Sequence, residues 1–106
     1  TKGWELNDEV EVALKSVFCP VVRVEKPTFG SLDLATLVRQ DYFRKDCALE
    51  LVGLCTDICV VSNALLLKAS LPEMPIAVDS NCVAGVTPES NDAALTTMKM
   101  CQIQVL

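Results

Sequence analysis

The second half of the chain alternates short, largely apolar runs with longer segments in which apolar residues recur every three or four positions. The runs at residues 48–54, 75–79 and 102–106 are typical of strands in a buried sheet. The segments at 57–69 and 87–100 have helical spacing. Strands that alternate with helices of this length indicate right-handed βαβ units. The pattern therefore predicts the α/β class: a three-layer α/β/α fold whose mostly parallel sheet carries helices on both faces.

The first half of the chain predicts two more helices and one more strand. Helical spacing begins at Asn7 or Asp8, either of which can cap the helix, and Pro20 ends it. A β-branched run at 21–26 predicts a strand that the next proline ends. Residues 31–40 begin with a serine hydroxyl and carry apolar residues on one side, which predicts the second helix.

The stretch at residues 49–65 is predicted to be a buried strand that turns directly into a helix. Gly53 ends the strand, and Thr56 has the chemistry of a helix N-cap. Cys59 then falls at about the third helical position, above unpaired backbone N–H groups at the positive end of the helix dipole. These groups favour the thiolate over the thiol, so Cys59 is a candidate nucleophile at the carboxyl edge of the sheet. The alternative is a buried structural thiol, because its neighbours are largely apolar.

Charge and length exclude several classes of function. The chain has 106 residues and a formal net charge of −5, and its lysines and arginines form no run. It therefore lacks the electrostatic footprint of a protein that binds nucleic acid or an anionic membrane, and no apolar stretch is long enough to span a bilayer. Residues 1–106 are expected to form a single domain, small for this architecture. A hydrophobic content of 51% is high for so short a domain, so part of the apolar surface is expected to meet another segment or chain.

Six cysteines and no histidine limit the metal and redox chemistry of the chain. Most of the cysteines lie inside apolar strand or helix patterns, which indicates free thiols in a reducing, cytoplasmic setting. No Cys-x-x-Cys pair occurs, so neither a zinc ribbon nor a dithiol redox site is expected. We therefore expect no metal or cofactor to be bound by this chain alone.

Four segments together resemble a known family. They are Lys26–Phe29, Gly53–Val60, Val78–Asp79 and Ala84–Glu89. In sequence and spacing they are similar to the isochorismatase-like cysteine hydrolases, the group that includes nicotinamidases. The resemblance covers residues 21–106 and implies the isochorismatase-like fold, with this chain as the C-terminal part of a larger hydrolase domain.

The resemblance implies a triad of aspartate, lysine and cysteine that cleaves a C–N bond of a small amide through a covalent acyl-enzyme. Carried onto this sequence, Cys59 is the nucleophile and Lys26 its cationic partner. The backbone N–H groups of Cys55 and Cys59 form the oxyanion hole, and a cis peptide bond is implied between Leu54 and Cys55. Phe29 is a candidate wall of a pocket for a flat substrate, with nicotinamide the first to consider. The alternatives are a solvated lysine for Lys26 and simple packing under the sheet for Phe29.

The chain departs from the family pattern in three respects. The family's aspartate should lie on a strand well upstream of Lys26, and Asp8, in a helix-like segment, is a poor substitute. The Asp/His site that binds a divalent, zinc-like metal in many nicotinamidases is also upstream, and Asn91 stands where many relatives have histidine. We expect such a metal to need residues outside this chain, and the chain to associate with the missing N-terminal part or to form a homo-oligomer. Two alternatives remain: an isochorismatase-type hydrolase of another small substrate, and a non-catalytic subunit that supports a partner chain.

Overall fold

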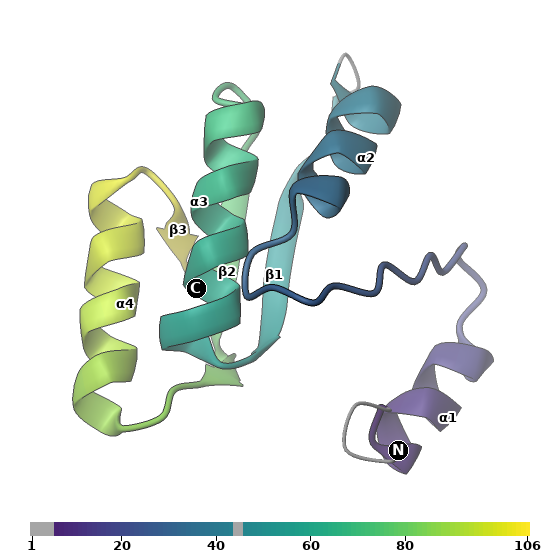
Figure 1. The fold of residues 1–106 in the computed structure, drawn as a ribbon, viewed down its shortest axis with the longest axis horizontal. Coiled ribbons are helices and arrows are strands. Elements are labelled where there is room, and N and C mark those ends of the chain that lie inside the picture. Colours follow the sequence, from purple (N-terminus) through teal and green to yellow (C-terminus); the bar gives the residue numbers. More distant parts are fainter. Residues whose placement is uncertain (1–5, 44–45) are drawn as a thin grey trace.

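The computed structural model describes residues 6–43 and 46–106, and Figure 1 shows their arrangement. In chain order the elements are α1 (Asp8–Ser16), α2 (Leu32–Tyr42), β1 (Leu49–Leu54), the π-helical turn η2 (Thr56–Val60), α3 (Val61–Ser70), β2 (Ile76–Ala84), α4 (Pro88–Met100) and β3 (Gln104–Val105). Within these described residues, no helix is both long and apolar enough to cross a membrane.

The three strands form one parallel sheet in the order β1-β2-β3. Leu51 of β1 pairs with Val78 of β2, which pairs on its other side with Val105 of β3. The register between β1 and β2 shifts between Leu51 and Gly53, where Gly53 takes a φ of +119° that residues with a Cβ rarely adopt. Each crossover between neighbouring strands passes through a helix, so the predicted βαβ units and the α/β class are confirmed.

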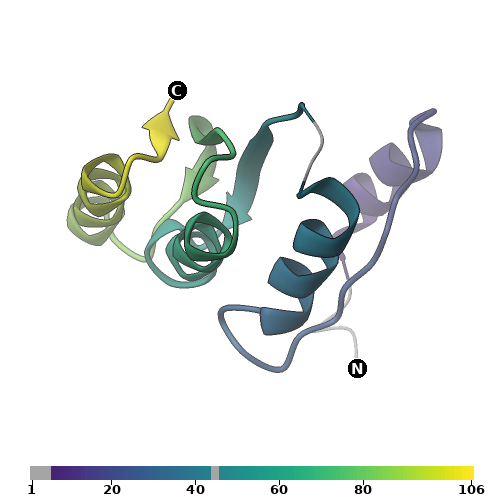
Figure 2. The same cartoon turned by 90° about the horizontal axis from the view of Figure 1, so that it is seen from above.

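The helices lie on one face of this sheet. Figures 1 and 2 show α3 and α4 on the same side of the strands, with α2 beside α3. Burial along β1 alternates accordingly, because successive side chains of a strand point to opposite faces. Leu49 and Leu51 pack against the core, whereas Val52 and Leu54 are 58% and 69% exposed. The residues that the structure describes therefore supply two of the three predicted layers.

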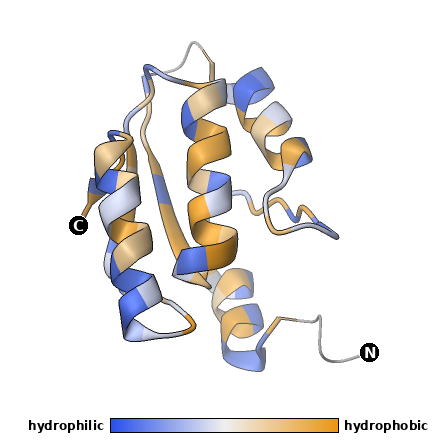
Figure 3. Ribbon diagram, turned by 60° about the vertical axis from the view of Figure 1, so that its left-hand side comes forward, coloured by the Kyte–Doolittle hydropathy of each residue, from blue (hydrophilic) through white to orange (hydrophobic). Residues whose placement is uncertain are grey.

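The core lies between the sheet and the helices α3 and α4. Ala64, Val78 and Met98 have no exposed surface, and Ile103 is 1% exposed. Helix α3 is apolar around most of its circumference, as its colour in Figure 3 shows. It contacts both α2 and α4, which explains this composition, since a helix with neighbours on several sides buries more than one stripe.

Helix α1 stands apart from the sheet, as Figure 2 shows, and has no buried residue. Asn7 caps it, as predicted, by accepting a hydrogen bond from the N–H of Glu9. An ion pair between Arg23 and Glu11 joins α1 to the segment that follows it. Exposed ion pairs of this kind contribute little to stability.

Two further helix starts follow their local signals. Ser31 caps α2 by accepting a hydrogen bond from the N–H of Leu34. Thr87 forms a capping box with Ser90, and Pro88 occupies the first turn of α4. These starts were predictable because the capping groups lie within three residues of the groups they satisfy.

Two predictions for the region that contains the candidate nucleophile and lysine are wrong. Residues 21–26 form no strand, because no neighbouring strand among the described residues pairs with them and a β-branched run needs such a partner. Thr56 does not cap a helix. Its side chain is buried, its Oγ1 has no hydrogen-bond partner in the described residues, and Cys55 occupies the N-cap position of η2 instead.

The last two strands differ from the prediction in length. Strand β2 runs to Ala84 through residues predicted to be a loop, because Gly53 and Leu54 of β1 pair with Val83 and Ala84 beyond the register shift. Strand β3 is limited to Gln104–Val105, where its partners on β2 lie.

Two methionines of α4 test the location of the core. Met98 is fully buried and Met100 is 80% exposed. We expect Met98→Ala to lower the unfolding free energy of the native protein by about 2–5 kcal/mol, because it leaves a cavity. Met100→Ala, the matched control, should change it by less than about 0.5 kcal/mol. Urea unfolding followed by circular dichroism measures both, and equal effects of the two substitutions would contradict this account of the core.

Candidate active site

The structure brings Lys26 and Cys59 together, although they lie 33 positions apart in the sequence. The Nζ of Lys26 lies 3.5 Å from the Sγ of Cys59, within hydrogen-bonding distance for sulfur. Lys26 is exposed and Cys59 is half-buried. The Nζ of Lys26 also donates to the carbonyl oxygen of Thr28 at 2.9 Å. A positive charge at this distance from a sulfur stabilises the thiolate, which is the reactive form of cysteine.

The turn η2 places Cys59 at the carboxyl end of β1, as predicted. The carbonyl oxygen of Cys55 accepts hydrogen bonds from the N–H groups of Ile58 and Val60 at 3.1 and 3.0 Å, and these bonds start the helical turn. The peptide bond between Leu54 and Cys55 is cis, as the family resemblance implies. The N–H of Cys55 makes no hydrogen bond within residues 6–43 and 46–106. It is therefore available to donate a hydrogen bond to a ligand oxygen.

The loop that carries Lys26 packs closely on α3, as Figure 1 shows for the segment that leads into α2. A Cβ added to Gly30 would lie 2.8 Å from the Cδ1 of Leu66 and 3.3 Å from the Cβ of Ser62. Both contacts are closer than ordinary van der Waals distance, so a side chain at this position would require Leu66 and Ser62 to shift, and glycine lets the loop lie close to the helix without that shift.

A buried asparagine joins this loop to the helix of the candidate nucleophile. Asn63 is 8% exposed. Its Oδ1 accepts a hydrogen bond from the N–H of Ser31 at 2.8 Å, and its Nδ2 donates to the carbonyl oxygens of Phe29 at 3.3 Å and Cys59 at 3.0 Å. The sequence analysis did not identify Asn63. The available signal was an amide side chain one helical turn after Cys59, between the apolar residues Val60, Val61 and Ala64–Leu67.

Asp57 links η2 to the start of α4. Its two carboxylate oxygens accept from the N–H of Val86 at 3.2 and 3.3 Å. A hydrogen bond with the Ser90 side chain, followed by backbone bonds that include Val86, lowers the pKa of Asp57. The sequence predicted only an acid in the first turn of a helix. The structure shows that this acid ties the turn bearing Cys59 to the neighbouring βα loop.

The remaining predicted residues lie in different surroundings. Phe29 is 66% exposed, so its ring does not pack under the sheet. Asp8 lies exposed in the first turn of α1. The Oδ1 of Asn91 is buried without a hydrogen-bond partner among the described residues. Within the same residues, no group of three His, Cys, Asp or Glu side chains is placed to hold a metal ion. The residues present therefore do not fit a metal site.

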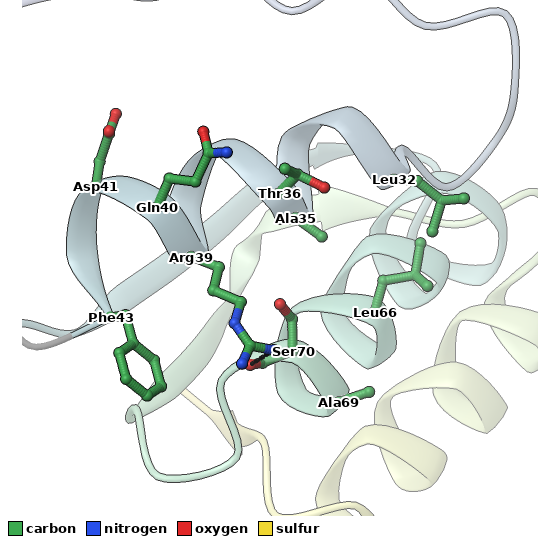
Figure 4. Close-up of a pocket in the computed structure, with 10 residues that line it drawn as sticks. All are labelled: Leu32, Ala35, Thr36, Arg39, Gln40, Asp41, Phe43, Leu66, Ala69 and Ser70. Carbon is green, nitrogen blue, oxygen red and sulfur yellow. Dashed lines mark hydrogen bonds between the residues drawn. The ribbon is translucent and has the colours of Figure 1, made fainter.

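Two surface hollows lie away from Lys26 and Cys59. The larger, of about 870 Å³, lies between α2 and α3 and is shown in Figure 4. Arg39 crosses it and donates to the carbonyl oxygen of Ser70 at 3.5 Å. The smaller, of about 550 Å³, is lined by Phe43 and by residues that follow α3. Neither hollow contains Phe29, so the predicted role of Phe29 in a substrate pocket stays a prediction.

The Asp57 contact has a pH-dependent consequence. Since hydrogen bonds hold the pKa of Asp57 below its ordinary value of 3.8, the carboxylate stabilises the fold fully above that value and loses this effect as the pH falls through its folded-state pKa. We expect Asp57→Asn to lower the thermal unfolding temperature at neutral pH, and the difference from wild type to shrink at pH values below 3.8. The exposed Glu73, replaced by Gln, is the control. A pH-independent deficit in Asp57→Asn would contradict the assignment.

Comparisons with known proteins identify the family and the fold of the chain. The sequence profile of the isochorismatase domain matches residues 1–106, whereas no curated protein sequence matches the chain. The nicotinamidase PncA from Bacillus subtilis is 28% identical with a TM-score of 0.78, over 99% of this chain and 59% of its own. The nicotinamidase SaPncA from Staphylococcus aureus is 25% identical with a TM-score of 0.73, over 92% of this chain and 62% of its own.

A third solved structure shares the fold. The pyrazinamidase of Pyrococcus horikoshii, solved in complex with zinc, is 24% identical with a TM-score of 0.64, over 77% of this chain and 45% of its own. The chain thus spans less than two thirds of the length of each of these three proteins. The resemblance inferred from the sequence is confirmed by the domain match over the full chain, and the protein belongs to the isochorismatase family.

Proposed function

We propose that this chain carries the nucleophile and the cationic partner of a cysteine-dependent hydrolase that cleaves the C–N bond of a small amide. The observation that carries the proposal is the 3.5 Å contact between the Nζ of Lys26 and the Sγ of Cys59. Membership of a family of hydrolases and likeness to two nicotinamidases support it. A buried structural thiol would have no need of a lysine ammonium at this distance.

The proposed chemistry has two steps. The Sγ of Cys59 forms a bond to the amide carbonyl carbon, the C–N bond breaks, and the amine leaves with the proton that the thiol gives up. Water then cleaves the thioester, which releases the carboxylic acid and restores the thiol. Lys26 favours the first step because its charge stabilises the thiolate that attacks.

The negative charge that develops on the carbonyl oxygen requires hydrogen-bond donors. We assign this role to the backbone N–H groups of Cys55 and Cys59. The assignment is supported by the N–H of Cys55, which makes no hydrogen bond within the described residues. Donors fixed by the backbone act without reorganising, so they stabilise the transition state more than the ground state. The thiol of Cys55 has no part in this scheme.

Nicotinamide is the first substrate to test, because two similar structures are nicotinamidases. Phe29 is proposed as one wall of the pocket, since its exposed ring lies on the loop that carries Lys26. The resemblance implies a catalytic aspartate and a divalent metal. We propose that this aspartate and the residues that bind the metal lie outside the described residues. We also propose a cytoplasmic location and association with a further segment or a second copy, in keeping with the exposed apolar face of β1.

Ammonia release from nicotinamide by the native protein tests the proposal. We expect Cys59→Ala to lower kcat about 10⁴- to 10⁶-fold, because it removes the nucleophile. Lys26→Met should lower it about 10²- to 10⁴-fold, because the thiol then lacks its cationic partner. Cys101→Ala, which removes an exposed thiol at the end of α4, is the matched control and should leave the rate unchanged.

Two results would count against the proposal. Turnover that survives Cys59→Ala would exclude a cysteine nucleophile. Loss of activity in Cys59→Ala together with full activity in Lys26→Met would keep the nucleophile but remove Lys26 from the site.

A further inference from the structure

We propose that Asn63 is a positioning residue that sets the distance between Lys26 and Cys59. This inference rests on the proposed function, in which that pair performs the chemistry. Every hydrogen bond of the Asn63 side chain in the described structure goes to a backbone atom, and none goes to the side chain of Lys26 or Cys59. Its side chain instead binds the backbone of the loop that carries Lys26 and the backbone of Cys59.

The three hydrogen bonds of Asn63 divide between two segments. The Nδ2 donates to the carbonyl oxygen of Cys59, four residues earlier in the turn η2 that leads into α3, at 3.0 Å. The same Nδ2 and the Oδ1 hold the loop, at the carbonyl oxygen of Phe29 and the N–H of Ser31. One planar amide therefore fixes two backbone points of the loop relative to the backbone of the candidate nucleophile.

The lysine end of the loop depends on this attachment. Residues 21–26 belong to no strand, so no ladder of backbone hydrogen bonds holds them within the described part of the chain. The Nζ of Lys26 holds the carbonyl oxygen of Thr28, and the hydroxyl of Thr28 donates to the carbonyl oxygen of Gly30. These bonds make residues 26–30 a locally connected unit, which the amide of Asn63 joins to α3.

The burial of Asn63 means that few other side chains can replace it. Asn63 is 8% exposed, and a buried polar group that loses its partner destabilises the state in which it is left. An apolar side chain of similar size would leave the loop carbonyl of Phe29 and the N–H of Ser31 without partners. The loop would then shift toward water, and Lys26 would move with it. A displacement of about 1 Å at a catalytic pair is enough to lower the rate about 10²-fold.

The competing explanation is a core asparagine that only stabilises the fold. Such a residue would change stability but not the pH dependence of the thiol. The experiment therefore measures the rate at which iodoacetamide alkylates Cys59 in the native protein as a function of pH, by mass spectrometry of the Cys59 peptide. It also measures kcat and KM for nicotinamide.

Two substitutions separate the contacts of Asn63. Asn63→Leu removes all three hydrogen bonds. Asn63→Ser keeps a hydroxyl that can donate to the carbonyl oxygen of Cys59, as Ser62 does to Ile58 at 2.5 Å in the same helix, but it is too short to hold the loop. The smaller serine also leaves room for water to bind the carbonyl oxygen of Phe29 and the N–H of Ser31. Asn63→Ser is therefore the variant that tests the inference if Asn63→Leu does not fold. Leu67→Val changes the packing of the buried face of α3 and is the matched control.

We expect Asn63→Ser and Asn63→Leu to move the midpoint of the alkylation profile upward, in the direction of Lys26→Met. Both should lower kcat about 10- to 100-fold with little change in KM, because the pair is misplaced while the pocket remains. Leu67→Val should keep the wild-type profile. Hydrogen exchange at the Ser31 amide should become faster in both Asn63 variants.

The outcomes distinguish this inference from the proposed function. If Lys26→Met shifts the profile and the folded Asn63 variants keep that of wild type, Asn63 is structural only, and the proposed function still stands. If Lys26→Met leaves the profile unchanged and Cys59→Ala retains turnover, the proposed function itself is wrong, and the role of Asn63 falls with it.

Discussion

The packing of α3 between α2, α4 and the sheet is the constraint on which the rest of the structure depends. Because neighbours cover several sides of this helix, it carries apolar residues on more than one side, and its first turns cannot move without opening the core. The candidate nucleophile lies in the turn that leads into α3. The loop carrying Lys26 rests on the same helix through Gly30 and Asn63. A rigid helix thus holds a site whose other half comes from an irregular segment.

The sequence predicted those features whose causes are local. Strand β1 is an apolar run, and the start of α4 has its cap, its proline and its partner serine within a few residues. The features it missed depend on partners far along the chain. The β-branched run at 21–26 has no strand beside it among the described residues and so forms none. Strand β2 is longer than predicted, because β1 pairs with its second half beyond the register shift. Thr56 failed as a cap because the backbone of Cys55 starts a π-helical turn there.

The site shows the same division. Cys59 was predicted as a candidate from its position after a strand, and Lys26 only from the family resemblance, since nothing in the residues between them indicates a contact. Asn63 and Asp57 were not identified as supports, because their roles come from the loops that they hold. The two lie on either side of Cys59 in the sequence and bind different loops. The turn that bears Cys59 is therefore fixed from two directions, which suits the nucleophile proposed here, because a nucleophile must meet its substrate in one orientation.

The central claim is that Cys59 becomes acylated during turnover. Acid quenching of the native protein with nicotinamide, followed by mass spectrometry of the peptide that contains Cys59, tests it most directly. The account predicts a nicotinoyl thioester on Cys59 that forms during turnover and disappears when the substrate is exhausted. Steady release of ammonia with an unmodified Cys59 peptide, or with the acyl group on another residue, would contradict it.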